Sequence, residues 1–194
     1  NSVRLVIVFC GLIIFFMLGQ ALAAQEDLVL IPDLSQARLA PYLSIYRDST
    51  IAMTLDDARR AFAEGLFQKN EDPWPKFGFT PDVIWVRFAV RSEDPERNRR
   101  LIELRTARMD YLDWYLIRQN GEVEHLAAGN LQPNSQGLLD NKFPVFPFSL
   151  AADEQVEVFL RIYSETSVHL PIKIWSPAAY VGVQARNEDR KSVV

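Results

Sequence analysis

The segment VIWVRFAVR, residues 83–91, decides the fold class. Its even-numbered residues are all apolar, whereas the odd-numbered ones include Trp85, Arg87 and Arg91. Side chains alternate between the two faces of a β-strand, so this pattern predicts a strand with one buried face. The segment is also rich in β-branched and aromatic residues, which are favoured in strands.

Similar short runs lie on both sides of this segment. Further strands are expected at residues 27–31, 42–46, 101–106, 110–118, 123–126, 143–150, 156–164 and 168–175. Asn120-Gly121 is a typical hairpin turn, and Pro144 and Pro147 place the 143–150 strand at a sheet edge. About nine short strands, with turn signals every ~8–12 residues, predict an all-β, antiparallel β-sandwich.

Two helices are expected beside the strands. Thr54 is a good N-cap, so residues 55–64 are predicted to form a short helix that Gly65 ends. Residues 66–82 contain three prolines and are expected to be a loop. The C-terminal stretch 176–194 is charged and predicted to be helical, with Ser176 as its N-cap.

Residues 1–24 have the pattern of a signal peptide for export. Arg4 precedes the apolar run 5–18, and small residues follow at 21–24. The run is shorter than the ~20 residues that cross a bilayer, so cleavage after Ala23 or Ala24 is expected. The chain is thereby divided into a signal peptide (1–24), an exported domain (25–175) and a helical linker toward a membrane region (176–194).

Charge and cysteine content narrow the possible functions. The single cysteine, Cys10, lies inside the signal peptide, so the exported domain has no thiol for disulfides, catalysis or zinc binding. The net charge of −4 gives no electrostatic reason to bind nucleic acid. An exported domain of this size without cysteine fits the bacterial periplasm.

The outward faces of the predicted strands are unusual. A sandwich buries one face of each sheet, and here the other face carries aromatic, arginine and histidine side chains. Such a surface suits a sugar or a small anion, because rings stack and arginines form charge-assisted hydrogen bonds. The expected ligand-binding residues are Trp85, Arg87, Glu103, Arg105, Arg161, Tyr163 and His169. In the alternative interpretation, helix 55–64 and loop 66–82 cover this face as a second small core, in which Arg87 and Arg161 pair with Glu103.

Enzymatic chemistry has no clear signature in this chain. No nucleophile motif, phosphate loop or dinucleotide fingerprint is present, and the two histidines lie on different predicted strands. Asp110 and Asp140-Asn141 could supply oxygen ligands for calcium, but they lack the spacing of a known calcium loop. We therefore expect neither catalysis nor a metal site nor a cofactor.

An ordered series of fragments resembles a known family. These fragments are Phe77-Gly78-Phe79, residues 83–88, residues 101–104, Met109-Asp110-Tyr111, Trp114-Tyr115, Ala128-Gly129, residues 143–147, residues 160–164 and residues 169–175. Over residues 39–175 the chain resembles the type 2 extracellular sensor domain of bacterial seven-transmembrane receptors with diverse intracellular signalling modules. It departs from the family pattern at Asn130, where the family has an acidic residue, and only Lys142 could stand for the basic residue that the family has before the 143–150 strand; a ligand-binding role of this loop is therefore not expected.

The resemblance implies a jelly-roll sandwich similar to carbohydrate-binding modules. It also implies a position in the periplasm, ahead of a seven-helix region in the inner membrane of a Gram-negative bacterium and a diguanylate cyclase or histidine kinase output. The expected function is therefore ligand sensing, with a sugar-like or anionic small molecule as ligand. Two alternatives stay open: a protein-interaction or homodimerisation module, and the carbohydrate-binding module of an exported hydrolase.

Overall fold

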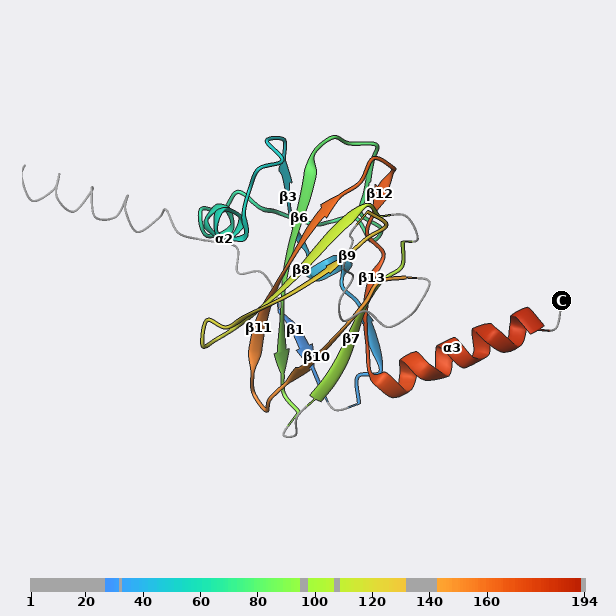
Figure 1. Cartoon of the computed structure of the whole chain (residues 1–194). Helices are drawn as coiled ribbons and strands as arrows, with labels where there is room; N and C mark the ends of the chain where they lie inside the picture. The colour runs from blue at the N-terminus through green and yellow to red at the C-terminus, as the bar shows by residue number, and fades with distance from the viewer. Residues whose placement is uncertain (1–26, 32, 95–97, 107–108, 132–142, 193–194) are drawn as a thin grey trace, which may run out of the picture.

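Two antiparallel sheets pack face to face in the computed structural model, which describes residues 27–31, 33–94, 98–106, 109–131 and 143–192 (Figure 1). The large sheet has the strand order β4-β3-β6-β11-β8-β9, with β1 parallel to β6; the small sheet has the order β10-β7-β13-β2, and β12 pairs with β5. The strands of the large sheet are β1 (Leu28–Leu30), β3 (Ser44–Asp48), β4 (Gln68–Lys69), β6 (Val83–Ser92), β8 (Tyr111–Arg118), β9 (Val123–Ala128) and β11 (Gln155–Tyr163). The remaining strands are β2 (Gln36–Arg38), β5 (Lys76–Gly78), β7 (Asn98–Leu104), β10 (Val145–Leu150), β12 (Val168–His169) and β13 (Ile172–Trp175).

The pairing of the strands has the nested order of a jelly roll. In sequence order the innermost pair is the hairpin β8–β9, which belongs to the large sheet. The pair that flanks it in sequence, β7–β10, belongs to the small sheet. The next pair outward, β6–β11, returns to the large sheet, and the outermost pair, β2–β13, lies in the small one. This alternation confirms the predicted all-β jelly-roll sandwich.

The main core lies between the sheets, on the face that the sequence pattern predicts. Ile84, Val86 and Phe88 are fully buried there, facing side chains such as Ile102 and Ile174 of the small sheet. Val158, Leu160 and Ile162 of β11 join them as the central strand of the large sheet. The alternation along β6 therefore predicts correctly which face of this strand turns to the core.

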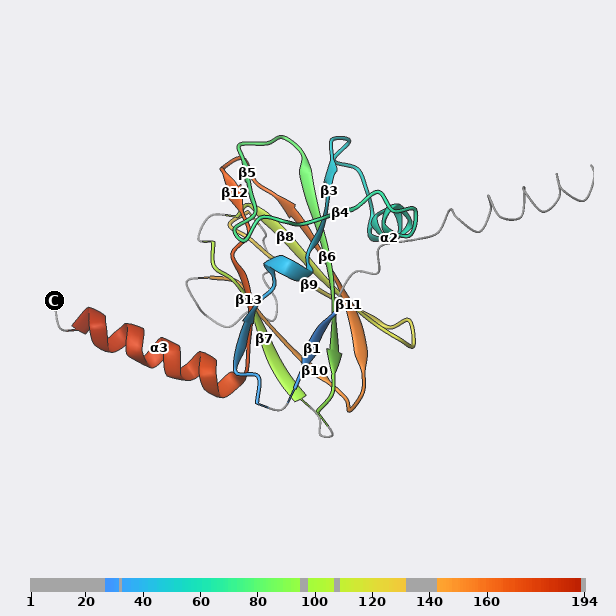
Figure 2. The ribbon, with the colours of Figure 1, turned by 180° about the vertical axis from the view of Figure 1, so that it is seen from behind.

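Two helices flank the sandwich on opposite sides (Figures 1 and 2). Helix α2 (Leu55–Ala63) begins at a capping box, in which Thr54 Oγ1 accepts from the backbone N–H of Asp57. Helix α3 (Pro177–Ser192) follows Ser176, whose Oγ accepts from the backbone N–H of Ala179 at 3.3 Å. Both predicted helices are confirmed.

Three details of the predicted strands are corrected. The expected strand 168–175 is two strands, β12 and β13, because Pro171 cannot donate to a ladder and the chain changes partner there. The expected loop 66–82 contains the short strands β4 and β5, and β2 was not predicted. The proline-containing strand β10 lies at a sheet edge as expected.

The predicted signal peptide and the pair Asp140-Asn141 lie outside the described residues. In the part of the chain that the structure describes, no helix combines the length and apolar character needed to cross a membrane.

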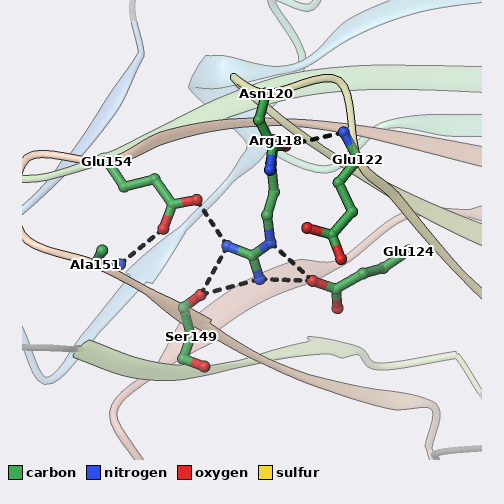
Figure 3. Close-up of polar contacts among 7 residues, drawn as sticks. All are labelled: Arg118, Asn120, Glu122, Glu124, Ser149, Ala151 and Glu154. Carbon is green, nitrogen blue, oxygen red and sulfur yellow. Dashed lines mark hydrogen bonds and ion pairs between the residues drawn. The ribbon is translucent and has the colours of Figure 1, made fainter.

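Arg118, at the end of β8, ties the two sheets together (Figure 3). Its guanidinium donates to Glu154 Oε1 at 2.7 Å, to Glu124 Oε1 on β9 at 3.0 Å and to the carbonyl oxygen of Ser149 on β10 at 3.3 Å. Burial acts to lower the pKa of Arg118, but the hydrogen bonds with Glu154 and Glu124 outweigh it and raise that pKa. The charge is therefore firmly held at the junction of β8, β9 and β10.

We expect Arg118→Met to lower the free energy of unfolding by about 2–3 kcal/mol, because it leaves two partly buried carboxylates without their partner. Urea unfolding at pH 7 measures this loss. The matched control is Arg91→Met, since the Arg91–Glu93 pair is 47% and 48% exposed and should contribute within about 0.5 kcal/mol. Equal losses in the two variants would show that Arg118 does not clamp the sheets.

Candidate functional site

The seven residues expected to bind a ligand do not share one face. Trp85, Arg87, Arg161 and Tyr163 lie on the outer face of the large sheet. Glu103 lies on β7 of the small sheet, and Arg105 follows directly after that strand. His169 lies on β12, which forms a two-stranded sheet with β5. The expectation of a single polar face is therefore wrong, because β6 and β11 belong to the large sheet, β7 belongs to the small one and β12 pairs with β5.

Helix α2 covers the Trp85 side of the large sheet. Trp85 and Phe159 are fully buried in a second core, together with Ala58 and Ala61 of the helix. The Phe159 ring makes an edge contact with Phe62 of α2, with ring centroids 6.5 Å apart. The alternative interpretation, a second small core beneath this helix, is thus confirmed.

Arginine pairing on this face differs from the expected one. Arg87 donates to Glu157 at 2.7 Å, and its guanidinium lies 4.3 Å from the ring centroid of Phe62. Arg161 lies 3.6 Å from Asp113 and donates to the carbonyl oxygen of Ile51 at 3.2 Å. Neither arginine pairs with Glu103, which belongs to the other sheet, so that part of the alternative is wrong.

A polar network lies on the outer face of the large sheet, next to Arg161. Asp113 joins Arg161 to His125, whose Nε2 lies 3.0 Å from Asp113 Oδ1. The His125 ring stacks on Tyr115 at 4.5 Å between centroids. Because Asp113 is already shared by two partners within the chain, this network is best explained as packing of the sheet face.

A pocket of about 240 Å³ lies on the outer face of the small sheet. Arg38 enters it from β2, Lys173 from β13 and Arg105 from the end of β7, while Trp74 forms a wall with Pro73. The remaining lining residues are Ala40, Leu170, Pro171 and Ile172. It therefore contains Arg105 among the expected residues, with Glu103 directly beside it.

The wall of the pocket is fixed by hydrogen bonds of the segment 70–75. The Asn70 side-chain amide donates to the carbonyl oxygen of Ala40 at 2.8 Å, and the Trp74 backbone N–H donates to Asp72 Oδ1 at 2.8 Å. The backbone N–H of Leu170 donates to the carbonyl oxygen of Pro75 at 3.0 Å. These bonds attach the Trp74 segment to both sides of the pocket, so the wall is preformed.

The electrostatics of the pocket are dominated by positive charge. Lys173 stands directly opposite Arg38 on one neighbouring strand and opposite Glu103 on the other. Burial lowers the pKa of Lys173, and the charges of Arg105 and Arg38 lower it further. Burial raises the pKa of Glu103 in spite of the nearby Arg105.

Glu103 connects the pocket to helix α3. One carboxylate oxygen lies 3.8 Å from Arg105 Nε, and the other accepts from Trp175 Nε1 at 3.1 Å. Trp175 packs edge-on against Tyr180 of α3, with ring centroids 6.1 Å apart, inside a small buried cluster with Leu101. A single buried side chain thus links Arg105 of the pocket to Trp175, on which the helix packs.

A larger groove of about 660 Å³ lies beyond the same wall segment. Its lining mixes Arg47, Lys69 and Lys76 with the carboxylates of Glu71 and Asp72. The mixed charge gives this groove no clear preference for a ligand class. Within the described residues, no group of three histidine, cysteine or acidic side chains is arranged to hold a metal ion.

The sequence did not reveal three residues of the pocket. Lys173 lies on the predicted outward face, but it is not among the expected ligand-binding residues. The predicted strand 168–175 does not show the interruption at Pro171, after which the strand changes its partner. Trp74 stands between two prolines in an expected loop, where no strand or helix pattern indicates whether a tryptophan is buried. In the structure it is 44% exposed, unlike a core tryptophan. Arg38 lies on a strand of three residues that has no recognisable pattern.

Comparison with known proteins gives a family and distant structural likenesses. The family model described as 7TMR-DISM extracellular 2 matches residues 40–176. A search of curated proteins finds no match. CBM35 from Cellvibrio japonicus Abf62 is 11% identical, with 72% of this chain and 90% of that chain covered and a TM-score of 0.34. CBM32-3 from a family 31 glycoside hydrolase from Clostridium perfringens is 11% identical, with 53% and 71% covered and a TM-score of 0.25.

A third likeness is to a much larger protein, a family GH115 4-O-methyl-alpha-glucuronidase. It is 11% identical, with 73% of this chain covered and a TM-score of 0.37, and the chain spans 17% of that protein's length. Identities and TM-scores this low assign no ligand to this chain.

Proposed function

We propose that this chain is the non-catalytic, ligand-sensing input domain of a seven-transmembrane receptor. The chain belongs to the 7TMR-DISM extracellular 2 family of receptor sensor domains. The ligand is a small molecule, and its site is the pocket of Arg38, Trp74, Arg105 and Lys173. The domain lies in the periplasm of a Gram-negative bacterium, ahead of an inner-membrane region. The observation that carries this proposal is the position of Glu103, which pairs with Arg105 of the pocket and accepts from Trp175, the residue that packs on the first turn of α3.

The same contacts suggest how occupancy reaches the helix. A ligand that engages Arg105 weakens its hold on Glu103, and Glu103 in turn orients the Trp175 indole through the N–H bond. Trp175 packs on Tyr180, so a change in its position alters how the first turns of α3 rest on Leu101 and Val145. Ligand binding then shifts the population between two orientations of α3, because it favours one of them.

We expect a ligand from a library of sugars, amino acids and organic acids to raise the thermal midpoint by about 5 °C or more at ~100 times its Kd. Hydrogen exchange of the bound protein should change at the backbone amides of residues 179–183, beyond the pocket. The absence of any compound that raises the midpoint of the folded protein would remove the sensing proposal.

The matched control for the relay is Trp175→Phe, which keeps a ring against Tyr180 but removes the N–H that Glu103 accepts. This variant should bind the ligand within about 3-fold of the parent affinity, since Trp175 does not line the pocket. Its exchange at residues 179–183 should no longer respond to ligand. A response as large as that of the parent would exclude the Glu103–Trp175 route.

A further inference from the structure

The pocket holds more positive charge than the described residues neutralise. Arg38, Arg105 and Lys173 line it, and Glu103 is the carboxylate beside them. In the part of the chain that the structure describes, Arg105 pairs with Glu103, whereas Arg38 and Lys173 form no ion pair with a carboxylate. This excess lies in a chain whose net charge is −4, so it is a local feature of the pocket.

The register of β2 and β13 places two of these cations side by side. Lys173 and Arg38 are direct cross-strand partners, and like charges directly opposite each other repel. Burial is the largest cause of the lowered pKa of Lys173; the charges of Arg105 and Arg38 lower that pKa further, whereas Glu103 raises it. A bound anion between the two strands would convert the repulsion into two attractive contacts.

The rest of the lining is apolar. Trp74, Leu170, Pro171 and Ile172 surround the cations, and the Arg38 guanidinium covers the Trp74 ring at 4.5 Å. An apolar cavity of about 150 Å³ holds a benzene molecule, so a pocket of about 240 Å³ has room for a six-membered ring with an acidic substituent.

We infer that this pocket binds a small carboxylate carried on a six-membered ring. The carboxylate lies between Arg38 and Lys173, within reach of Arg105, and the ring packs against Trp74 and Ile172. This inference rests on the proposed function and names the ligand class of the same site. Aromatic acids and sugar acids share this chemistry.

Two pairs of probes separate charge from shape. Benzoate is compared with benzyl alcohol, and glucuronate with glucose, by calorimetric titration of the purified protein at low ionic strength. We expect at least one acid to bind at least 10-fold more tightly than its neutral counterpart, because a charge-assisted hydrogen bond to each of two cations is lost in the neutral compound. The pair that shows the difference tells whether the source is an aromatic or a sugar acid.

The matched variants are Lys173→Gln and Arg59→Gln, which remove the same charge from the pocket and from the exposed face of α2. Lys173→Gln should weaken binding of the acid about 10–100-fold, and Arg59→Gln should change it less than 2-fold. The thermal midpoint of unliganded Lys173→Gln should stay close to that of the parent, because the lost repulsion with Arg38 offsets the lost attraction to Glu103 and to the Trp175 ring. A residue with a purely structural role would lower the midpoint instead.

Three results would overturn the inference. Neutral probes that bind as tightly as the acids would show that charge does not select the ligand. Equal weakening by Arg59→Gln and Lys173→Gln would show that binding follows overall charge rather than this pocket. A neutral library compound that raises the midpoint and moves α3, while neither acid binds, would overturn this inference and leave the proposed function standing.

Discussion

Replacing Gly129 with alanine is expected to lower the free energy of unfolding by about 3–5 kcal/mol. Gly129 follows β9 with φ at +126°, and an added Cβ would lie 2.3 Å from the carbonyl oxygen of Asp110 and 2.8 Å from its carbonyl carbon. Both atoms are backbone, so no flexible side chain can move aside. The clash would also disturb the Asp110 carboxylate, which accepts from Ser164 Oγ at 2.9 Å and from the Glu165 N–H at 2.7 Å.

The control is Gly121→Ala in the β8–β9 hairpin. Gly121 also has a positive φ, +86°, but nothing lies within 4 Å of the position of a Cβ. Only the backbone strain remains, and it should cost about 1–2 kcal/mol. Urea unfolding with an unchanged m-value measures both losses. If the two variants lose the same stability, close backbone approach is not what requires glycine at position 129.

Trp85→Ala is expected to cost about 3–5 kcal/mol, because the indole is fully buried between the large sheet and α2. Its ring stacks on Tyr115 with centroids 6.2 Å apart, and truncation would leave a cavity in the second core. The buried Nε1 has no hydrogen-bond partner among the described residues, so Trp85→Phe should cost clearly less than the alanine variant.

The control is Trp74→Ala, which removes the same side chain from the wall of the pocket. Trp74 is 44% exposed, so its truncation should cost about 1 kcal/mol or less while it weakens ligand binding about 10-fold or more. Denaturant unfolding and ligand titration of both variants give the comparison. The opposite pattern, in which Trp85→Ala is stable and loses ligand, would return the site to the large sheet.

The sequence by itself determined which face of the central strands is buried. Ile84, Val86 and Phe88 turn to the core because side chains on a strand alternate, and no distant contact is needed to say so. Local signals likewise determined the start of α2 at Thr54 and the hairpin at Asn120-Gly121, since a cap and a tight turn involve only neighbouring residues. The ordered series of family fragments also predicted the jelly roll and the sensor family.

Only the tertiary structure decided which strands share a sheet. Arg87 and Glu103 follow the same local pattern, yet β6 lies in the large sheet and β7 in the small one, because strand partners are chosen through long-range pairing. Likewise, burial beneath α2 turned Trp85 from an expected ligand contact into a core residue.

The pocket itself depends on the same long-range choices. Arg38, Trp74 and Lys173 come from three separate parts of the chain, and the register of β2 against β13 brings Arg38 opposite Lys173. The residue pattern of a short segment predicts only the secondary structure of that segment. Pairing between strands that are distant in sequence places the like charges of Arg38 and Lys173 side by side. The periodicity within one strand does not predict such pairing.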